Sequence, residues 1–136
     1  MANDTVTVTR AGSEPASVGA TENFTGSVRV EGRFAGTSPA TISGATVTFE
    51  PGARTAWHTH PLGQTLVVVS GVGHVQHWEG PVQDIRAGDV VWIPPGVKHW
   101  HGATPGNAMS HVAFSETVNG SSVEWLEQVG DDQYPG

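Results

Sequence analysis

The sequence predicts an all-β domain, folded as a small barrel or a double-sheet jelly roll. Valine outnumbers leucine nineteen to three, and β-branched residues favour strands. The 18 glycines and 9 prolines divide the chain into short segments, several of which alternate apolar and polar side chains as half-buried strands do. Because 136 residues suit one domain, we assign residues 1–136 to a single domain with its barrel core at about 24–118.

The strands are predicted from this alternation, and the turns from glycine and proline. The stretch 5–9 alternates strictly, which predicts an edge strand, whereas the apolar stretch 65–70 predicts a central strand buried on both faces. Turns are expected at Pro51-Gly52, at Gly71 with Gly73, and at 94–96. Further strands are expected at 24–30, 45–49, 74–78, 90–93, 98–101 and 109–116.

A short C-terminal helix is expected after the last strand. Ser121 and Glu124 have the spacing of a capping box, in which the serine side chain meets a backbone amide and the glutamate reaches back. Val123, Leu126 and Val129 then recur at helical spacing. We expect this helix to pack across one end of the sheets.

Composition and charge exclude several classes of function. The chain has no cysteine, so disulfides, thiolate zinc sites, iron–sulfur clusters and cysteine nucleophiles are excluded. A net charge of −7 with only six Lys and Arg argues against nucleic acid or an anionic membrane as partner. The segment MANDTVTVTR has no apolar stretch of the kind found in signal peptides, so we expect a cytoplasmic protein.

Histidines on two predicted hairpins form a candidate metal site. His58 and His60 are two residues apart, and such residues on a strand face the same side. Gln64 follows after a Pro-Leu-Gly turn and can direct its amide oxygen to the same point, and a later hairpin supplies His99. Three imidazole nitrogens and one amide oxygen suit Mn, Fe, Co, Ni or Zn, and disfavour Ca or Mg.

These two segments resemble the cupin superfamily, whose motifs are G-x₅-H-x-H-x₃₋₄-E-x₆-G and G-x₅-P-x-G-x₂-H-x₃-N. Gln64 stands where the first motif has glutamate, and Gly102 and Ala103 occupy the region of the final asparagine of the second. The resemblance implies a cupin β-barrel with a metal inside it. The positions that match the motifs are Gly52, His58, His60, Gly71, Gly88, Pro94, Gly96 and His99.

From about Arg10 to Tyr134 the chain resembles more closely the bacterial manganese-dependent cupin hydroxynitrile lyases. In that family the ligands are three histidines and a glutamine, which correspond to His58, His60, Gln64 and His99 here. The resemblance implies Mn²⁺ as cofactor and reversible cleavage of an (R)-cyanohydrin, such as mandelonitrile, to an aldehyde and HCN. Four neutral ligands would leave the full charge of a divalent ion, which strengthens it as a Lewis acid.

This reaction needs a base that is neutral near pH 6–7. His111 is the first candidate, because the corresponding histidine of the lyases lines the metal cavity. His101 has the same strand parity as His99 and is the second candidate, with an equal alternative as a hydrogen-bonding partner or a satisfied core residue.

Small apolar side chains are expected to line the substrate pocket. Ala45 and Val47 share one face of their strand and match positions that line the cavity of the lyases. Thr55, Trp92 and Phe114 are weaker candidates, for which core packing is the alternative role.

Four further polar residues are predicted to lie at the surface. His74 and His77 have opposite strand parity and no motif around them, and Arg54 and Glu50 flank the first motif. We therefore expect surface positions for all four, with the mouth of the pocket as the alternative for His74 and His77.

Two other function classes remain open from the sequence. The same ligands could hold Fe(II) in a different cupin enzyme, such as a dioxygenase or an isomerase, and the barrel could instead bind a small molecule without catalysis. A homo-oligomer, dimer or tetramer, is expected because the edge strand at 5–9 would expose unpaired backbone groups and small cupins usually associate.

Overall fold

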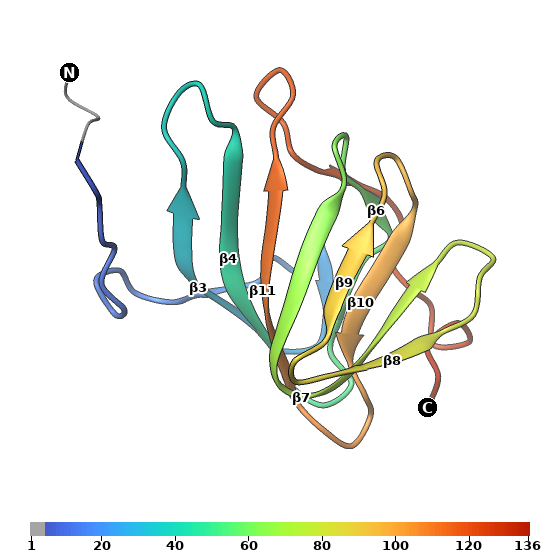
Figure 1. The fold of residues 1–136 in the computed structure, drawn as a ribbon. Helices are drawn as coiled ribbons and strands as arrows, with labels where there is room; N and C mark the ends of the chain where they lie inside the picture. The colour runs from blue at the N-terminus through green and yellow to red at the C-terminus, as the bar shows by residue number, and fades with distance from the viewer. Residues whose placement is uncertain (1–4) are drawn as a thin grey trace.

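The computed structural model describes residues 5–136 as a curled, twelve-stranded antiparallel sheet (Figure 1). This confirms the all-β prediction; residues 1–4 of the predicted domain lie outside the described residues. The strands are β1 (Ser17–Val18), β2 (Phe24–Thr25), β3 (Val28–Ala35), β4 (Ile42–Phe49), β5 (Arg54–Thr55), β6 (His58–Thr59), β7 (Gln64–His77), β8 (Gln83–Arg86), β9 (Val90–Ile93), β10 (His99–Ala103), β11 (Met109–Glu116) and β12 (Glu124–Trp125).

The long strand β7 joins the two halves of the curled sheet. Its first half pairs with β11 and β9, and β11 continues the sheet through β4 to β3. Its second half pairs with β8 and β10, and β10 pairs in turn with the short strands β5 and β6. Figure 1 shows β3, β4 and β11 on one side of β7, and β10 and β8 on the other. The interior between these halves holds both the core and the site.

The turn predicted at Gly71 and Gly73 is wrong, because β7 runs through both residues. The strand instead carries a β-bulge: Ser110 is opposite Ser70 but His111 is opposite Val68. A bulge of this kind bends a strand and changes which side chains face inward. The buried set accordingly changes along β7 from Leu66 and Val68 to Gly73 and Val75.

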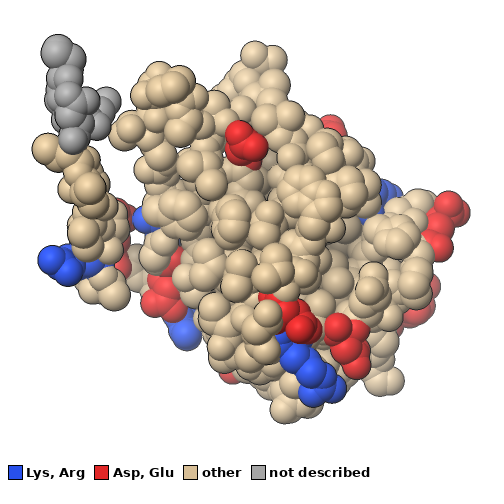
Figure 2. All heavy atoms as spheres, in the orientation of Figure 1, with Lys and Arg blue, Asp and Glu red and all other residues tan. Residues whose placement is uncertain are grey.

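The first half of β7 is also less buried than its apolar sequence predicts. Leu66 and Val68 are almost fully buried, but the side chain of Val69 is 51% exposed. The outward face of this part of the sheet carries further exposed apolar residues, Val90 and Trp92 of β9. Figure 2 shows this face with few charged side chains across its middle. The strand is therefore buried on one face, and the prediction of burial on both faces is wrong.

The predicted C-terminal helix is wrong, and no helix occurs among the described residues. Trp125 is instead a strand residue paired with His58 in β6. The Leu126 N–H donates to the Trp57 carbonyl, and the Trp57 N–H donates to the Glu127 carbonyl. These bonds to a distant segment replace the local bonds of a helix, so tertiary pairing overrides the helical spacing of the apolar residues.

The edge strand predicted at 5–9 does not form. Val6 and Val8 are 94% and 61% exposed, and neither lies in a ladder. The homo-oligomer, expected in part from this strand, stays a prediction. Within the described part of the chain, no helix is long and apolar enough to cross a membrane.

Two apolar clusters stabilise the sheet. The main cluster lies inside the curl and includes Phe49 of β4, Val68 of β7 and Met109 of β11, all essentially buried. The second lies against the C-terminal segment, where Trp57 and Trp100 pack on Val129. Trp57 and Trp100 thus face away from the histidines that neighbour them in sequence, as strand alternation predicts.

We predict that Gly71→Ala destabilises the protein more than Gly88→Ala. Both glycines have positive φ, +79° and +96°, where an L side chain costs about 1–2 kcal/mol. Only at Gly71 would the new methyl group also overlap a backbone oxygen, that of Ala108, which adds about 1–3 kcal/mol. Urea unfolding measures the difference. Equal losses of unfolding free energy in the two variants would contradict the close contact between Gly71 and the Ala108 carbonyl.

Candidate metal centre

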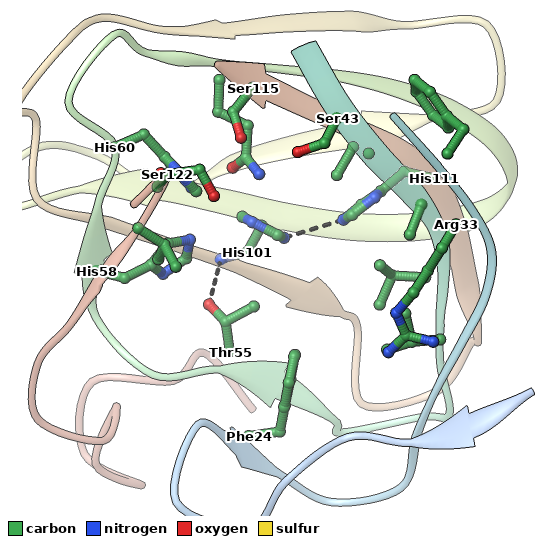
Figure 3. A pocket seen from close by; sticks show the side chains of 18 of the residues that line it. Phe24, Arg33, Ser43, Thr55, His58, His60, His101, His111, Ser115 and Ser122 are labelled. Carbon is green, nitrogen blue, oxygen red and sulfur yellow. Dashed lines mark hydrogen bonds between the residues drawn. The ribbon is translucent and has the colours of Figure 1, made fainter. Parts of the chain in front are cut away.

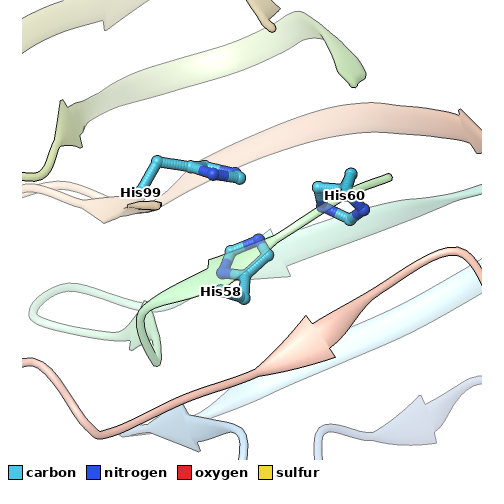
Figure 4. Close-up of side chains that lie close together, drawn as sticks. All are labelled: His58, His60 and His99. Atoms are coloured by element: carbon cyan, nitrogen blue, oxygen red, sulfur yellow. The ribbon is translucent and has the colours of Figure 1, made fainter. Parts of the chain in front are cut away.

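Three buried histidines meet where β6 lies beside β10. His58 of β6 is paired in register with His99 of β10, and their rings are 4.2 Å apart between centroids. His60 follows β6, so its side chain leaves the same face as that of His58. One ligand atom from each of the three lies within 4.8 Å of the others. Figure 4 shows the three rings converging, as the sequence spacing predicts.

Backbone carbonyls fix the tautomer of all three rings. The Nδ1 atoms donate to the carbonyls of Ala56, Ser122 and Val97, at 2.8, 2.6 and 2.9 Å respectively. Because a carbonyl oxygen only accepts, each Nδ1 carries the proton and each Nε2 keeps its lone pair. Metal-binding imidazoles are usually oriented in this way, by a hydrogen bond from the ring nitrogen that does not bind the metal.

Gln64, the first residue of β7, completes a set of four donors. Its Oε1 lies 3.4 Å from His99 Nε2. With the His99 proton on Nδ1, these two atoms are both acceptors and have no proton between them. His60 Nε2 is likewise buried without a hydrogen-bond partner. Buried lone pairs that face one another repel and lack a partner, and a bound cation would supply one. These residues therefore fit a divalent metal.

Burial keeps the three histidines neutral. Desolvation lowers the pKa of His58 well below its usual value, lowers that of His60, and lowers that of His99 to about 4. No carboxylate of the described residues belongs to the cluster. An uncharged set of three nitrogens and one oxygen suits a transition metal ion.

A cavity of about 690 Å³ opens beside this cluster (Figure 3). Of the predicted pocket residues, Ala45 and Val47 of β4 and Thr55 of β5 line it. Trp92 and Phe114 do not. Phe114 lies between Ala113 and Ser115, which do line the cavity, so strand alternation places it on the opposite face. Trp92 is 59% exposed on β9.

His101 and His111 form a second buried pair on the cavity wall. His111 Nε2 lies 3.0 Å from His101 Nδ1, and the remaining ring nitrogens, His101 Nε2 and His111 Nδ1, have no partner. One ring donates its single N–H to this bond, so its other nitrogen carries a lone pair and can accept a proton. The second ring accepts the bond, so its other nitrogen carries the N–H. Together the neutral pair therefore offers one proton acceptor and one N–H donor.

The protonation of this pair is also set by burial. Desolvation lowers the pKa of His101 well below its usual value, and a positive His111 would lower it further. Desolvation lowers the pKa of His111 to about 4. Both rings are consequently neutral at physiological pH, as a general base has to be before it reacts.

Several cavity residues were not among the sequence candidates. Ser43 and Ser115 line the cavity from paired positions on β4 and β11, and they share strand parity with Ala45 and His111, which was a usable signal. Ser122 and Trp125 line it from the C-terminal segment. No local pattern pointed to these two, because the spacing there predicts a helix.

Two of the four residues predicted at the surface are in fact buried. His74 is 9% exposed, and its Nδ1 lies 3.1 Å from Asp84 Oδ1 across β7 and β8. Arg54 is 6% exposed and bonds to the C-terminal segment. His77 and Glu50 are exposed, as expected.

Comparison with known proteins agrees with this geometry. Residues 45–113, from β4 to β11, match the model of the cupin domain. The chain belongs to the cupin family. This range includes His58, His60, Gln64, His99, His101 and His111.

The relatives of this cupin extend the likeness over almost the whole chain. It is 54% identical over 127 residues to a protein of Granulicella tundricola named (R)-mandelonitrile lyase, covering 93% of this chain and 97% of that one. A solved cupin-like protein of Thermotoga maritima is 38% identical, with a TM-score of 0.81 and 95% of each chain covered. A DMSP lyase of Ruegeria pomeroyi shares the fold alone, at 14% identity and a TM-score of 0.64 over 85% of this chain and 64% of that one.

We predict that a divalent metal stabilises the protein through the histidine cluster. A ligand that binds only the folded state at one hundred times its dissociation constant adds about 2.7 kcal/mol. Mn²⁺ should therefore raise the thermal midpoint of the wild type and of His77→Ala, but not that of His60→Ala. An equal rise in all three proteins would place the ion elsewhere.

We also predict that the metal-free protein loses stability as the pH falls from about 6.5 towards 4. The folded pKa of His111 is about 4 against an unfolded value of 6.5, so in this window the unfolded chain takes up a proton that the folded protein does not. The effect is absent above pH 6.5, where both states are neutral. Denaturant titrations at several pH values test this. The unfolding free energy of a His111→Gln variant should depend less steeply on pH than that of the wild type, and an equal dependence would contradict the prediction.

Proposed function

We propose that this cupin is a metal-dependent hydroxynitrile lyase. It would cleave an (R)-cyanohydrin, such as mandelonitrile, reversibly to an aldehyde and HCN. The observation that carries the proposal is 54% identity, over 93% of this chain, with a protein named (R)-mandelonitrile lyase. The arrangement of protein groups around the cavity supports it.

The metal would be held by Nε2 of His58, His60 and His99 together with Oε1 of Gln64. We propose Mn²⁺, on the resemblance of the four ligands to those of the manganese-dependent lyases. When bound, a divalent ion supplies Lewis acidity, which lowers the pKa of a nearby hydroxyl group.

The His101–His111 pair would move the proton. In one arrangement His111 Nε2 donates to His101 Nδ1, which leaves a lone pair on His111 Nδ1 and an N–H on His101 Nε2. His111 Nδ1 then removes the hydroxyl proton of the cyanohydrin. The bond between the carbinol carbon and the nitrile breaks, its electron pair leaves with cyanide, and a carbonyl group forms. Return of the proton to cyanide gives HCN and restores the neutral pair.

The cavity walls would orient the substrate and exclude water. Ala45, Val47 and Ala113 give one wall small apolar side chains, and Phe24 and Phe49 add aromatic surface. Such an apolar wall suits the aromatic group of mandelonitrile. Burial of the His101 and His111 rings also favours the neutral histidines that this mechanism needs.

The direct test is release of benzaldehyde from mandelonitrile by protein loaded with Mn²⁺, compared with protein stripped by a chelator. We expect release that depends on the metal and favours the (R) enantiomer. A fully loaded sample with no release above background would refute the proposed reaction. Oxygen uptake by an Fe(II)-loaded sample would favour a cupin dioxygenase instead.

We predict that His111→Ala lowers kcat by about 10² to 10⁴, the usual contribution of a general base. His77→Ala is the matched control, because His77 is an exposed histidine outside the cavity. Both variants should bind Mn²⁺ as the wild type does. Full activity in His111→Ala would remove this residue from the mechanism while leaving the metal centre intact.

A further inference from the structure

The segment 121–134, which we call the C-terminal strap, crosses behind two of the proposed metal ligands. The Ser122 carbonyl accepts the bond from His60 Nδ1, at 2.6 Å, and Figure 3 shows Ser122 beside His60. The Trp125 ring lies 4.7 Å from the His58 ring between centroids. Strand β12 of the strap also pairs with β6, residue by residue, at Trp125 and His58. The orientation of both rings therefore depends on where the strap lies.

Arg54 of β5 anchors the far end of the strap. Its Nη2 donates to the Val129 carbonyl and to Asp131 Oδ1, both at 2.9 Å. Its guanidinium group lies 4.4 Å from the centre of the Tyr134 ring, and the Tyr134 hydroxyl donates to the Ala103 carbonyl at 2.6 Å. Arg54 thus holds the strap at three residues.

The burial of Arg54 costs desolvation free energy that its own contacts do not fully recover. Its side chain is 7% exposed, its Nε is buried without a partner, and its carboxylate partner Asp131 is fully exposed. A buried guanidinium in a poor ion pair contributes little net stability, and an apolar side chain of similar volume often packs as well. Among the described residues, the polar contacts of its side chain other than the one to the Gly52 carbonyl go to the strap, at Val129, Asp131 and Tyr134.

We propose that Arg54 is a positioning residue of the metal centre. It acts through the strap: it fixes the segment that carries Ser122 and Trp125, and these in turn fix the rings of His60 and His58. The inference rests on the metal centre of the proposed function, but not on the reaction assigned to it. Loss of the anchor should let the Ser122 carbonyl drift, free the His60 ring to turn, and weaken metal binding.

The test compares Arg54→Met and Arg54→Lys with the wild type. Methionine removes the charge at similar volume, whereas lysine keeps the charge but cannot form the planar, forked contact. Arg29→Met is the matched control, because Arg29 is half-exposed on β3 and forms an ion pair with Glu31, away from the strap. Asp131→Ala is a further variant that cannot disturb the core, since its side chain is fully exposed.

Two readouts are needed, and neither requires turnover. Calorimetric titration with Mn²⁺ should give about tenfold weaker binding for Arg54→Met, the loss expected if the Ser122 carbonyl no longer holds the His60 ring. Arg54→Lys and Asp131→Ala should be weakened less, and Arg29→Met not at all. Hydrogen exchange should be faster at the Trp57 and Leu126 amides, whose bonds tie the strap to the sheet, and unchanged at Val112 of β11.

Each outcome decides the inference. If Arg54→Met lowers the thermal midpoint but all variants keep the wild-type affinity for Mn²⁺, Arg54 is merely structural and the inference is refuted. If Arg54→Met does not fold, unchanged affinity in Arg54→Lys and Asp131→Ala refutes it equally. A wild type that binds no divalent metal overturns both the metal centre and this inference. A wild type that binds metal but does not cleave mandelonitrile overturns only the proposed reaction, and the graded affinities then still support the positioning role.

Discussion

The site depends on three hydrogen bonds from imidazole Nδ1 atoms to backbone carbonyls, those of Ala56, Ser122 and Val97. Each bond places the proton on Nδ1, so each Nε2 keeps a lone pair directed at a common point. The acceptors are main-chain atoms and do not vary with the local side chains. Two of them, Ala56 and Val97, lie two residues before the histidine they orient, and the third comes from the distant C-terminal strap.

The buried histidines make this arrangement costly without a cation. Desolvation lowers the pKa of the cluster and of the His101–His111 pair, so five imidazoles are held neutral in one region. Among the described residues no carboxylate joins the cluster to balance a metal ion's charge. The same neutrality leaves the His101–His111 pair with one acceptor and one donor on the cavity wall. The bulge in β7 lies opposite Ser110 and His111 and changes which residues of β7 itself face inward.

Strand alternation predicted the histidine cluster and part of the cavity lining from the sequence. The spacing of His58 and His60, and the shared parity of Ala45 with Val47, predict which side chains meet in the interior, because a strand has a period of two. The C-terminal segment could not be foreseen this way. Its apolar spacing fits a helix, and only the pairing of Trp125 with His58 decides otherwise. For the same reason the role of the Ser122 carbonyl and the burial of Arg54 were hidden, since both depend on contacts between residues more than sixty positions apart.

We propose that tautomers fixed by the backbone present three Nε2 atoms to one metal ion. Anomalous diffraction at the manganese absorption edge, from crystals grown with Mn²⁺, tests it most directly. We expect one strong peak bound by Nε2 of His58, His60 and His99 and by Oε1 of Gln64, with each Nδ1 still hydrogen-bonded to its carbonyl. A peak bound through any Nδ1, or an ion located away from these four residues, would contradict it.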